Sequence, residues 1–272
     1  MYKIISTRGN NMTAKNIISL TTFPARINTV HLVIKTLLAQ TVPADKVVLW
    51  LAPEQFPKRE QELPQSLLEL THQGLEIKWC PDIKSYKKLI PALEIFPTDN
   101  IITADDDIIY PNDFLERLLE THKHYPKDII AHRVRKIAIR KNQILPYKKW
   151  RLSETRGIFN FAFHGGYNNL LGGGGGVLYP PKSLDSNVFD SEKFMTLCKH
   201  QDDVWFWAMA VKNNRKIIPT KRGYNLRKRA MEEVQSVGLW QSVNSKSDSP
   251  NNTAINNILN AYPEIKSRLK IR

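Results

Sequence analysis

The sequence predicts an α/β fold in which a mostly parallel sheet is flanked by helices within a single domain. Runs rich in β-branched and aliphatic residues alternate with helical stretches through the first hundred residues. Strands and helices that alternate in this way form parallel βαβ units with right-handed crossovers. Of the 272 residues, 42% are hydrophobic and 24% are charged, which is ordinary for a globular chain that buries a core. The length suits one large domain.

Four strands are predicted in the first half of the chain. They occupy residues 16–22, 46–51, 75–79 and 100–104. Helices with apolar spacing are predicted between them at residues 27–40, 64–73 and 87–95, and Gly74 ends the second of these. Because open α/β sheets bind ligands at the carboxyl ends of their strands, we expect the functional loops directly after these four strands.

The second half of the chain is less regular. A helix is predicted at residues 114–122, and an apolar helix or buried segment at 203–211. Strand-like runs are predicted at 129–139 and a last strand at 216–219. Residues 242–257 are polar and predict a loosely held connection. The last fifteen residues predict a basic terminal helix.

The net charge of +14 is concentrated in two stretches. Residues 123–156 contain eleven basic and two acidic residues, and residues 212–229 contain eight basic and no acidic residues. Concentrated positive charge attracts anions such as phosphates, an anionic lipid surface, an acidic polymer or nucleic acid. A solvated face is the alternative interpretation. Since no known nucleic-acid-binding motif is present, we expect no nucleic-acid partner.

Three features predict a cytoplasmic protein. The first fifteen residues contain no apolar segment of the kind that a secretory signal requires. The longest apolar run, residues 204–211, is far shorter than the roughly 20 residues of a membrane-spanning helix. The two cysteines, Cys80 and Cys198, exclude a disulfide scaffold and a four-cysteine zinc site, and favour a reducing compartment.

Three consecutive carboxylates, Asp105, Asp106 and Asp107, follow the fourth predicted strand. Neighbouring carboxylates raise one another's pKa, and a divalent cation relieves that repulsion. Alternate side chains of an extended segment point the same way, so we expect Asp105 and Asp107 to converge and Asp106 to point elsewhere. Oxygen ligands suit Mg²⁺ or Mn²⁺. A turn or a helix N-cap is the alternative, since Asp favours both.

Five consecutive glycines occupy residues 172–176. The spacing matches neither a phosphate-binding P-loop nor a dinucleotide-binding loop. Because glycine permits close backbone approach, we interpret the run as a wall against which a bulky substrate lies. A flexible loop without contacts is the alternative.

Two further carboxylates, Asp202 and Asp203, directly precede an apolar helix. One of them is a candidate general base for an acceptor hydroxyl. Simple capping of the helix is the alternative. The neighbouring Trp205 is interpreted either as a platform for a sugar or as part of the core.

Together these segments resemble glycosyltransferases of the GT-A fold, close to the family 2-like bacterial polysaccharide enzymes. The resemblance rests on SLTTFPARI at residues 19–27, TADDD at 103–107, GGGGGVLYP at 172–180 and QDDVWF at 201–206. It implies a hexosyl- or N-acetylhexosaminyltransferase that uses Mn²⁺ or Mg²⁺. Such an enzyme moves a sugar from a nucleotide diphosphate, expected to be a UDP-sugar, to a hydroxyl of a glycan or lipid-linked acceptor in surface polysaccharide synthesis.

The resemblance also implies a division of the chain. Residues 13–110 would form the nucleotide-sugar-binding half and residues 111–241 the acceptor-binding half of the same domain, followed by the connection and basic helix at 242–272. Attraction between the basic stretches and an anionic membrane would place the enzyme peripherally on the inner membrane face.

The resemblance assigns roles to individual residues. Contacts to the nucleotide-sugar fall to Thr21, Thr22, Phe23, Arg26, Asp82, Lys87, Lys88, Asp105 and Asp106. The metal falls to Asp107 and Asp105, and the acceptor to Gly174, Gly175 and Trp205. The base is Asp203, but Gln201 stands where the family often has Glu, so the choice between Asp202 and Asp203 stays open.

Two other classes of protein fit parts of the pattern. A nucleotidyltransferase on a related α/β fold would share the metal and lack the glycosyl acceptor. A basic nucleic-acid-binding protein would account for the charge and leave the carboxylates unexplained. Donor sugar, linkage and stereochemical outcome are not decided by the sequence.

Overall fold

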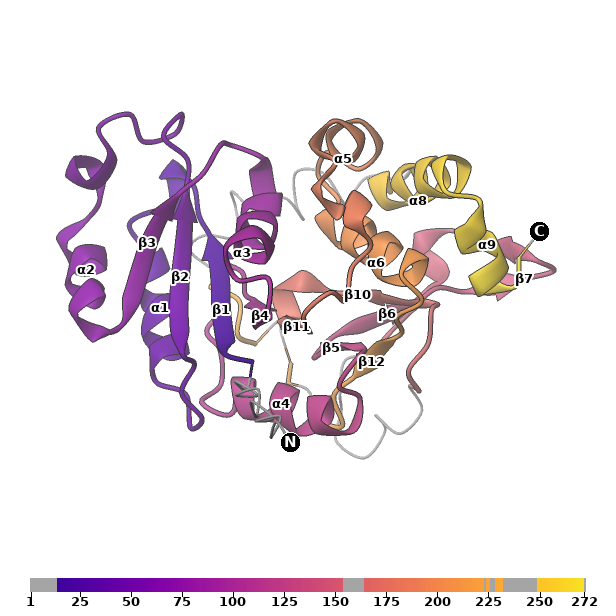
Figure 1. Cartoon of the computed structure of the whole chain (residues 1–272), viewed down its shortest axis with the longest axis horizontal. Helices are drawn as coiled ribbons and strands as arrows, with labels where there is room; N and C mark the ends of the chain where they lie inside the picture. Colours follow the sequence, from indigo (N-terminus) through magenta and orange to yellow (C-terminus); the bar gives the residue numbers. More distant parts are fainter. Residues whose placement is uncertain (1–13, 154–163, 223, 226–227, 232–248, 272) are drawn as a thin grey trace, which may run out of the picture.

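The computed structural model describes residues 14–153, 164–222, 224–225, 228–231 and 249–271. Its centre is a seven-stranded sheet with the order β12-β5-β11-β4-β1-β2-β3 (Figure 1). The strands are β1 (Asn16–Thr21), β2 (Lys46–Leu51), β3 (Leu75–Trp79), β4 (Asn100–Thr103), β5 (Ile129–Ala131), β11 (Val177–Tyr179) and β12 (Ile217–Pro219). Only β11 runs antiparallel to its neighbours, β4 and β5. The predicted mostly parallel sheet is confirmed.

The central strands are buried on both faces, which explains why they read as continuous apolar runs. Ile17 and Ile18 in β1 are both 0% exposed. Because successive side chains of a strand point to opposite faces, Ile17 packs in one hydrophobic cluster and Ile18 in a second cluster.

Helices cover both faces of this sheet (Figure 1). One face packs against α1 (Val30–Leu38), α2 (Gln65–Leu68) and α4 (Phe114–His124). The other packs against α3 (Ile90–Ile95), α5 (Ser191–Leu197), α6 (Asp202–Lys212), α8 (Pro250–Ala261) and α9 (Glu264–Leu269). No helix of the described residues is long and apolar enough to cross a membrane.

Several predicted helices are shorter in the structure. The first begins at Val30, because Pro24–Arg26 forms a separate 3₁₀ turn, and the third begins at Ile90 after a 3₁₀ turn at Lys84–Lys88. The second ends in a 3₁₀ segment, Glu69–Gln73. Gly74 follows this segment with φ +107°, as its role as a helix stop requires.

The polar connection predicted at residues 242–257 is wrong from residue 250 onward. Those residues belong to α8, whose Ile255 and Ile258 are buried against the core. Residues 232–248, with the expected boundary between 241 and 242, lie outside the described residues.

A smaller antiparallel sheet adjoins the central one. It has the order β10-β6-β9 and consists of β10 (Asn169–Leu171), β6 (Val134–Lys136) and β9 (Arg151–Leu152). A hairpin of β7 (Ile139–Arg140) and β8 (Gln143–Ile144) extends from it. Since β10 leads directly into the glycine run, this sheet lies beside the carboxyl ends of β4 and β5.

Candidate active site

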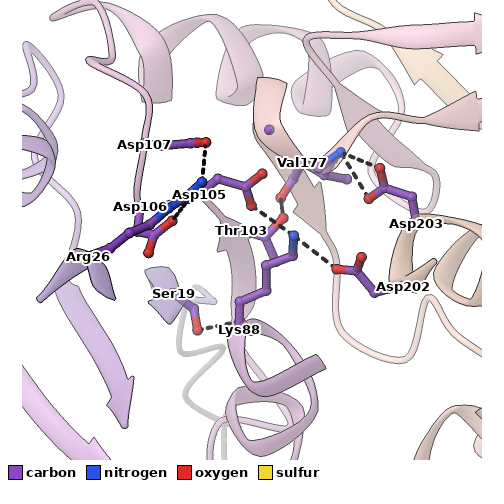
Figure 2. Close-up of polar contacts among 12 residues, drawn as sticks. Ser19, Arg26, Lys88, Thr103, Asp105, Asp106, Asp107, Val177, Asp202 and Asp203 are labelled. Atoms are coloured by element: carbon purple, nitrogen blue, oxygen red, sulfur yellow. Dashed lines mark hydrogen bonds and ion pairs between the residues drawn. The ribbon is translucent and has the colours of Figure 1, made fainter. Parts of the chain in front are cut away.

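The carboxyl end of the sheet gathers carboxylates from two distant parts of the sequence (Figure 2). Asp105, Asp106 and Asp107 follow β4, and Asp202 and Asp203 begin α6. The 3₁₀ turn at Lys84–Lys88 places a lysine between the two groups. The structure therefore brings the two acidic motifs of the sequence together in one place.

Lys88 connects the two acidic groups. Its Nζ lies 2.8 Å from Asp105 Oδ1 and 3.0 Å from Asp202 Oδ2 (Figure 2). The side chain is buried, and burial opposes the charge, but Asp105 and Asp202 raise the pKa of Lys88 well above its usual value. The link between β4 and α6 is therefore ionic.

A buried hydrogen-bond chain fixes the backbone of Lys88. Ser19 Oγ donates to the Lys88 carbonyl at 2.6 Å, and Trp50 Nε1 donates to Ser19 Oγ at 2.9 Å. Both partners lie on the central strands β1 and β2. The sheet thus sets the position from which the Lys88 side chain extends.

Arg26 attaches the first loop to the aspartate triplet. Its guanidinium lies 2.5 Å from Asp106 Oδ1 and 3.1 Å from Asp107 Oδ2, and Thr22 Oγ1 donates to Asp106 Oδ2 at 2.6 Å. Burial opposes the charge on Arg26, but Asp106 and Asp107 raise its pKa overall. The guanidinium also lies 5.5 Å from the centre of the Phe23 ring. Thr22, Phe23 and Arg26 therefore form one unit with the triplet.

The expected alternation within the triplet is wrong. Asp106 and Asp107 share the Arg26 guanidinium, whereas Asp105 faces Lys88. The reason is that β4 ends at Thr103 and residues 106–107 form a turn, so the two-residue periodicity of a strand does not reach them.

The carboxylates outnumber the cations beside them. Burial, followed by Asp105, raises the pKa of Asp107 to about 6. Burial, followed by Asp202, raises the pKa of Asp203 to about 7. No group of three or more His, Cys, Asp or Glu side chains among the described residues is arranged to hold a metal ion. Two carboxylates with excess negative charge are nonetheless the usual protein share of a Mg²⁺ site that is completed by substrate phosphates.

The glycine run is packed, which the flexible-loop alternative does not predict. The Gly173 N–H donates to both carboxylate oxygens of Asp203, at 3.0 and 3.1 Å. A Cβ at Gly173 would lie 2.6 Å from Asp203 Oδ1 and 2.9 Å from Lys88 Nζ. Gly176 has φ +87°, and a Cβ there would lie 2.1 Å from the Phe114 ring. Gly176 therefore requires glycine, and a side chain at position 173 would displace Asp203 or Lys88. Contact of Gly174 and Gly175 with a substrate stays a prediction.

Asp82 and Lys87 form a second ion pair outside this cluster. Lys87 Nζ lies 2.6 Å from Asp82 Oδ1, and Lys84 Nζ lies 3.2 Å from Asp82 Oδ2. The neighbours Lys87 and Lys88 thus serve different carboxylates. On the first strand, Thr21 Oγ1 donates to the Trp50 carbonyl at 2.8 Å.

Trp205 does not belong to an acceptor site. It is 0% exposed, its Nε1 donates to the Val188 carbonyl at 3.1 Å, and its ring meets Phe194 and Tyr262 edge-on. A sugar could reach this ring only if the core were opened. The acceptor role is therefore wrong, and the core alternative is confirmed.

Two features of the site were not anticipated. The Tyr110 hydroxyl accepts from the Asp105 N–H at 2.8 Å and lies 3.2 Å from the Gly174 carbonyl, which ties the triplet to the glycine run. The segment that directly follows the second basic stretch also returns to the triplet, because the Met231 N–H donates to the Asp107 carbonyl at 2.9 Å. The Tyr110 contact could have been suggested only by the nearness of Tyr110 to the triplet in sequence. The charge pattern did not indicate the Met231 contact.

The mostly parallel central sheet with helices on both faces has the GT-A-like arrangement. No protein-family model matches the sequence, and no curated protein matches it either. Residues 1–349 of TarS from S. aureus, in complex with UDP, match with a TM-score of 0.50 and 11% identity, over 92% of this chain and 72% of that chain. This likeness shows a shared fold.

Two further solved structures resemble the chain more weakly. A 4-diphosphocytidyl-2C-methyl-D-erythritol synthase matches with a TM-score of 0.45 and 14% identity, over 83% of this chain and 96% of that chain. A CMP:2-keto-3-deoxy-manno-octonic acid synthetase complexed with CTP matches with a TM-score of 0.43 and 11% identity, over 93% of this chain and all of that chain.

Proposed function

We propose that this protein is a metal-dependent glycosyltransferase. It moves a sugar from a nucleotide diphosphate, a UDP-sugar, to a hydroxyl of a glycan or lipid-linked acceptor. The observation that supports this proposal is the meeting of the aspartate triplet and the acidic pair around Lys88 (Figure 2). The aspartate triplet suits a donor diphosphate with its cation, and the acidic pair suits an acceptor hydroxyl.

On the donor side, Asp105 and Asp107 would hold Mg²⁺ or Mn²⁺ by exchanging their ion pairs with Lys88 and Arg26 for the metal. Their carboxylates are crowded, and the pKa of Asp107 is raised to about 6 by burial and by Asp105, so a cation beside them would relieve repulsion. When bound, the metal would act as a Lewis acid that neutralises charge on the departing diphosphate. The neighbouring loop of Thr22, Phe23 and Arg26 would bind the nucleotide.

On the acceptor side, Asp203 suits the role of base better than Asp202. Asp202 is paired with the buried ammonium of Lys88, whereas both oxygens of Asp203 accept one backbone N–H from Gly173. A pKa of about 7, raised mainly by burial and then by Asp202, is matched to proton transfer near neutral pH. Asp203 would remove the acceptor proton in an inverting reaction and would orient the acceptor in a retaining one.

The substitution Asp107→Asn tests the proposal. Turnover of a panel of UDP-sugars with Mn²⁺ is measured alongside circular dichroism. We expect Asp107→Asn to abolish metal-dependent turnover while the fold is kept, and the exposed Glu120→Gln on α4 to behave as wild type. Turnover by Asp107→Asn at the wild-type rate would refute the metal assignment.

A second assay separates the proposal from a nucleotidyltransferase on a related fold. The protein is supplied with CTP or UTP and a sugar phosphate, and pyrophosphate release is followed. A glycosyltransferase gives no pyrophosphate and releases UDP from a UDP-sugar. Release of pyrophosphate without any turnover of UDP-sugars would favour the alternative.

A further inference from the structure

A group of cations lies beside the candidate base and has no part in the function proposed above. The Gly172 N–H donates to the Arg133 carbonyl at 2.9 Å, and a Cβ at Gly175 would lie 2.7 Å from Arg133 Cβ. The Gly173 N–H between them holds Asp203. Arg133 and Asp203 therefore contact the same glycine turn.

Arg135 extends this group along β6 and is held in a defined position. Its guanidinium lies 4.5 Å from the centre of the Tyr147 ring, and Nη1 donates to the Trp150 carbonyl at 3.3 Å. The Tyr147 N–H in turn donates to Asn252 Oδ1 at 2.8 Å, which ties the arrangement to α8. A guanidinium has five N–H donors, so a group held in this way keeps the capacity to bind an anion.

The electrostatics of Tyr147 link this group to the base. The pKa of the Tyr147 hydroxyl is raised, chiefly by burial. Arg135 and Arg133 lower this pKa, and Asp203 raises it further. The hydroxyl therefore experiences the charges of both arginines and of Asp203.

The surface beyond the two arginines is basic as well. Residues 129–153 contain eight Lys and Arg residues and no Asp or Glu. They lie on and around the small sheet and its hairpin, whose strand β7 lies at the right of Figure 1. Five of them are exposed: Arg140, Lys141, Lys148, Lys149 and Arg151. Basic residues thus extend from the glycine turn that Asp203 contacts to exposed positions on the small sheet and its hairpin.

We propose that Arg133 and Arg135 form an acceptor subsite that binds a carboxylate or phosphate of an acidic glycan, and that the basic small sheet guides the following units of the chain. The inference rests on the proposed function, because it takes Asp203 as the acceptor-side base. Both arginines are only partly exposed. Arg133 lies beside the glycine turn, and Arg135 pairs with Leu170 of β10, shortly before that turn. A discrete group of an extended polymer reaches such a position more readily than a flat lipid surface does.

Binding of charged and neutral oligosaccharides to the full chain tests the subsite. Calorimetry is performed with oligogalacturonate, with its methyl ester, which has the same sugars without the charge, and with a glycerol phosphate oligomer. We expect the methyl ester to bind about tenfold more weakly than oligogalacturonate, the equivalent of one charge-assisted hydrogen bond. Added salt should weaken binding of both charged oligomers, and whichever binds more tightly identifies the preferred anion.

Variants assign the effect to Arg135. We expect Arg135→Gln to weaken oligogalacturonate binding about tenfold and Arg135→Lys to weaken it less, since Lys keeps the charge and loses the planar fork. The exposed Lys35→Gln on α1 removes the same charge elsewhere and should have no effect. Equal binding of ester and acid, wild-type binding by Arg135→Gln, or binding to anionic vesicles with no binding to either charged oligomer would overturn the proposal.

A titration of the same proteins with UDP and Mn²⁺ keeps the two proposals distinguishable. Arg135→Gln and Arg135→Lys should take up UDP as the wild type does, which also verifies their folding. If the wild type takes up no UDP but binds oligogalacturonate through Arg135, the proposed function fails and the anion site stands. If UDP binds and the charged oligomers do not, the subsite fails and the donor site stands.

Discussion

The Lys88 ammonium lies 3.0 Å from the Asp202 carboxylate and joins the start of α6 to the end of β4. Its other partner, Asp105 at 2.8 Å, belongs to the triplet that also holds the first loop through Arg26. The two acidic motifs of the sequence thus depend on one buried cation. This dependence makes Lys88 the residue whose removal should disturb both sides of the site.

We expect Lys88→Met to lower the free energy of unfolding by about 3 kcal/mol, because it leaves the buried carboxylate of Asp202 and the partly exposed carboxylate of Asp105 without their cation. Urea unfolding at pH 7 measures the effect. The double variant Lys88→Met with Asp202→Asn should recover part of the loss, since it also removes one of the unpaired charges. The exposed Lys35→Gln on α1 serves as the control. A loss for Lys88→Met no larger than that of the control would show that the ion pairs contribute nothing to stability.

The glycine run permits a matched comparison of two alanine variants. A Cβ at Gly173 would meet Asp203 Oδ1 at 2.6 Å, whereas a Cβ at Gly172 would have its nearest contacts at 3.4–3.5 Å, with Arg133. We therefore expect Gly173→Ala to lose about 1–3 kcal/mol of stability and most of the transfer activity, through displacement of Asp203. Gly172→Ala should stay close to wild type in both. Thermal unfolding and initial rates measure the pair, and equal behaviour of the two variants would contradict the packing argument.

The strands of the central sheet could be predicted because they are buried on both faces and read as unbroken apolar runs. The sequence does not predict which carboxylate each of Lys87 and Lys88 contacts. This depends on the register of a 3₁₀ turn, which brings Lys87 to Asp82 and Lys88 to Asp105. The predicted orientation of the three aspartates was wrong for a related reason. A turn replaces the extended backbone directly after β4.

The helix α8 was missed because its composition opposes it. Asparagine, which recurs through this segment, has a low helix propensity, so a polar loop was the local prediction. The helix forms because its apolar residues, Ala254, Ile255, Ile258 and Leu259, are buried against the core. Tertiary packing supplies most helical stability in proteins, and a local pattern does not reveal the surface against which a helix will pack.

His132 predicts a loss of stability in acid. Burial lowers its pKa to about 4, and its ring nitrogens lie 2.9 Å from the Phe114 carbonyl and 3.2 Å from Thr220 Oγ1. The folded-state pKa lies below the unfolded value of about 6.5, so neutral His132 favours the folded state. Its contribution to the free energy of unfolding is complete above pH 6.5 and is lost as the pH falls through 4. We expect His132 to lower the free energy of unfolding by about 2–3 kcal/mol over this pH range. Unfolding curves of wild type and His132→Gln between pH 7 and pH 4 isolate the effect, and parallel pH dependence of the two proteins would contradict it.

Asp203 should show the opposite pH dependence. Its pKa of about 7, raised by burial and then by Asp202, lies above the unfolded value of about 3.9. A group whose pKa is raised by folding stabilises the protein at a pH below its unfolded-state pKa. This stabilisation is lost as the pH rises through the folded-state pKa, so ionised Asp203 destabilises the protein above pH 7. We therefore expect Asp203→Asn, which can still accept the Gly173 N–H, to raise the free energy of unfolding at pH 8 by about 2 kcal/mol.

The gain from Asp203→Asn should shrink toward zero as the pH falls from 7 to 4, because wild-type Asp203 is then protonated in the folded protein and increasingly so in the unfolded chain. The same variant should abolish sugar transfer, since an amide does not remove a proton. Urea unfolding at several pH values and transfer rates at pH 8 are measured together. A variant that is more stable and inactive fits a carboxylate kept at a cost to stability for its chemistry. A less stable variant at pH 8 would instead identify Asp203 as a structural cap of the glycine turn.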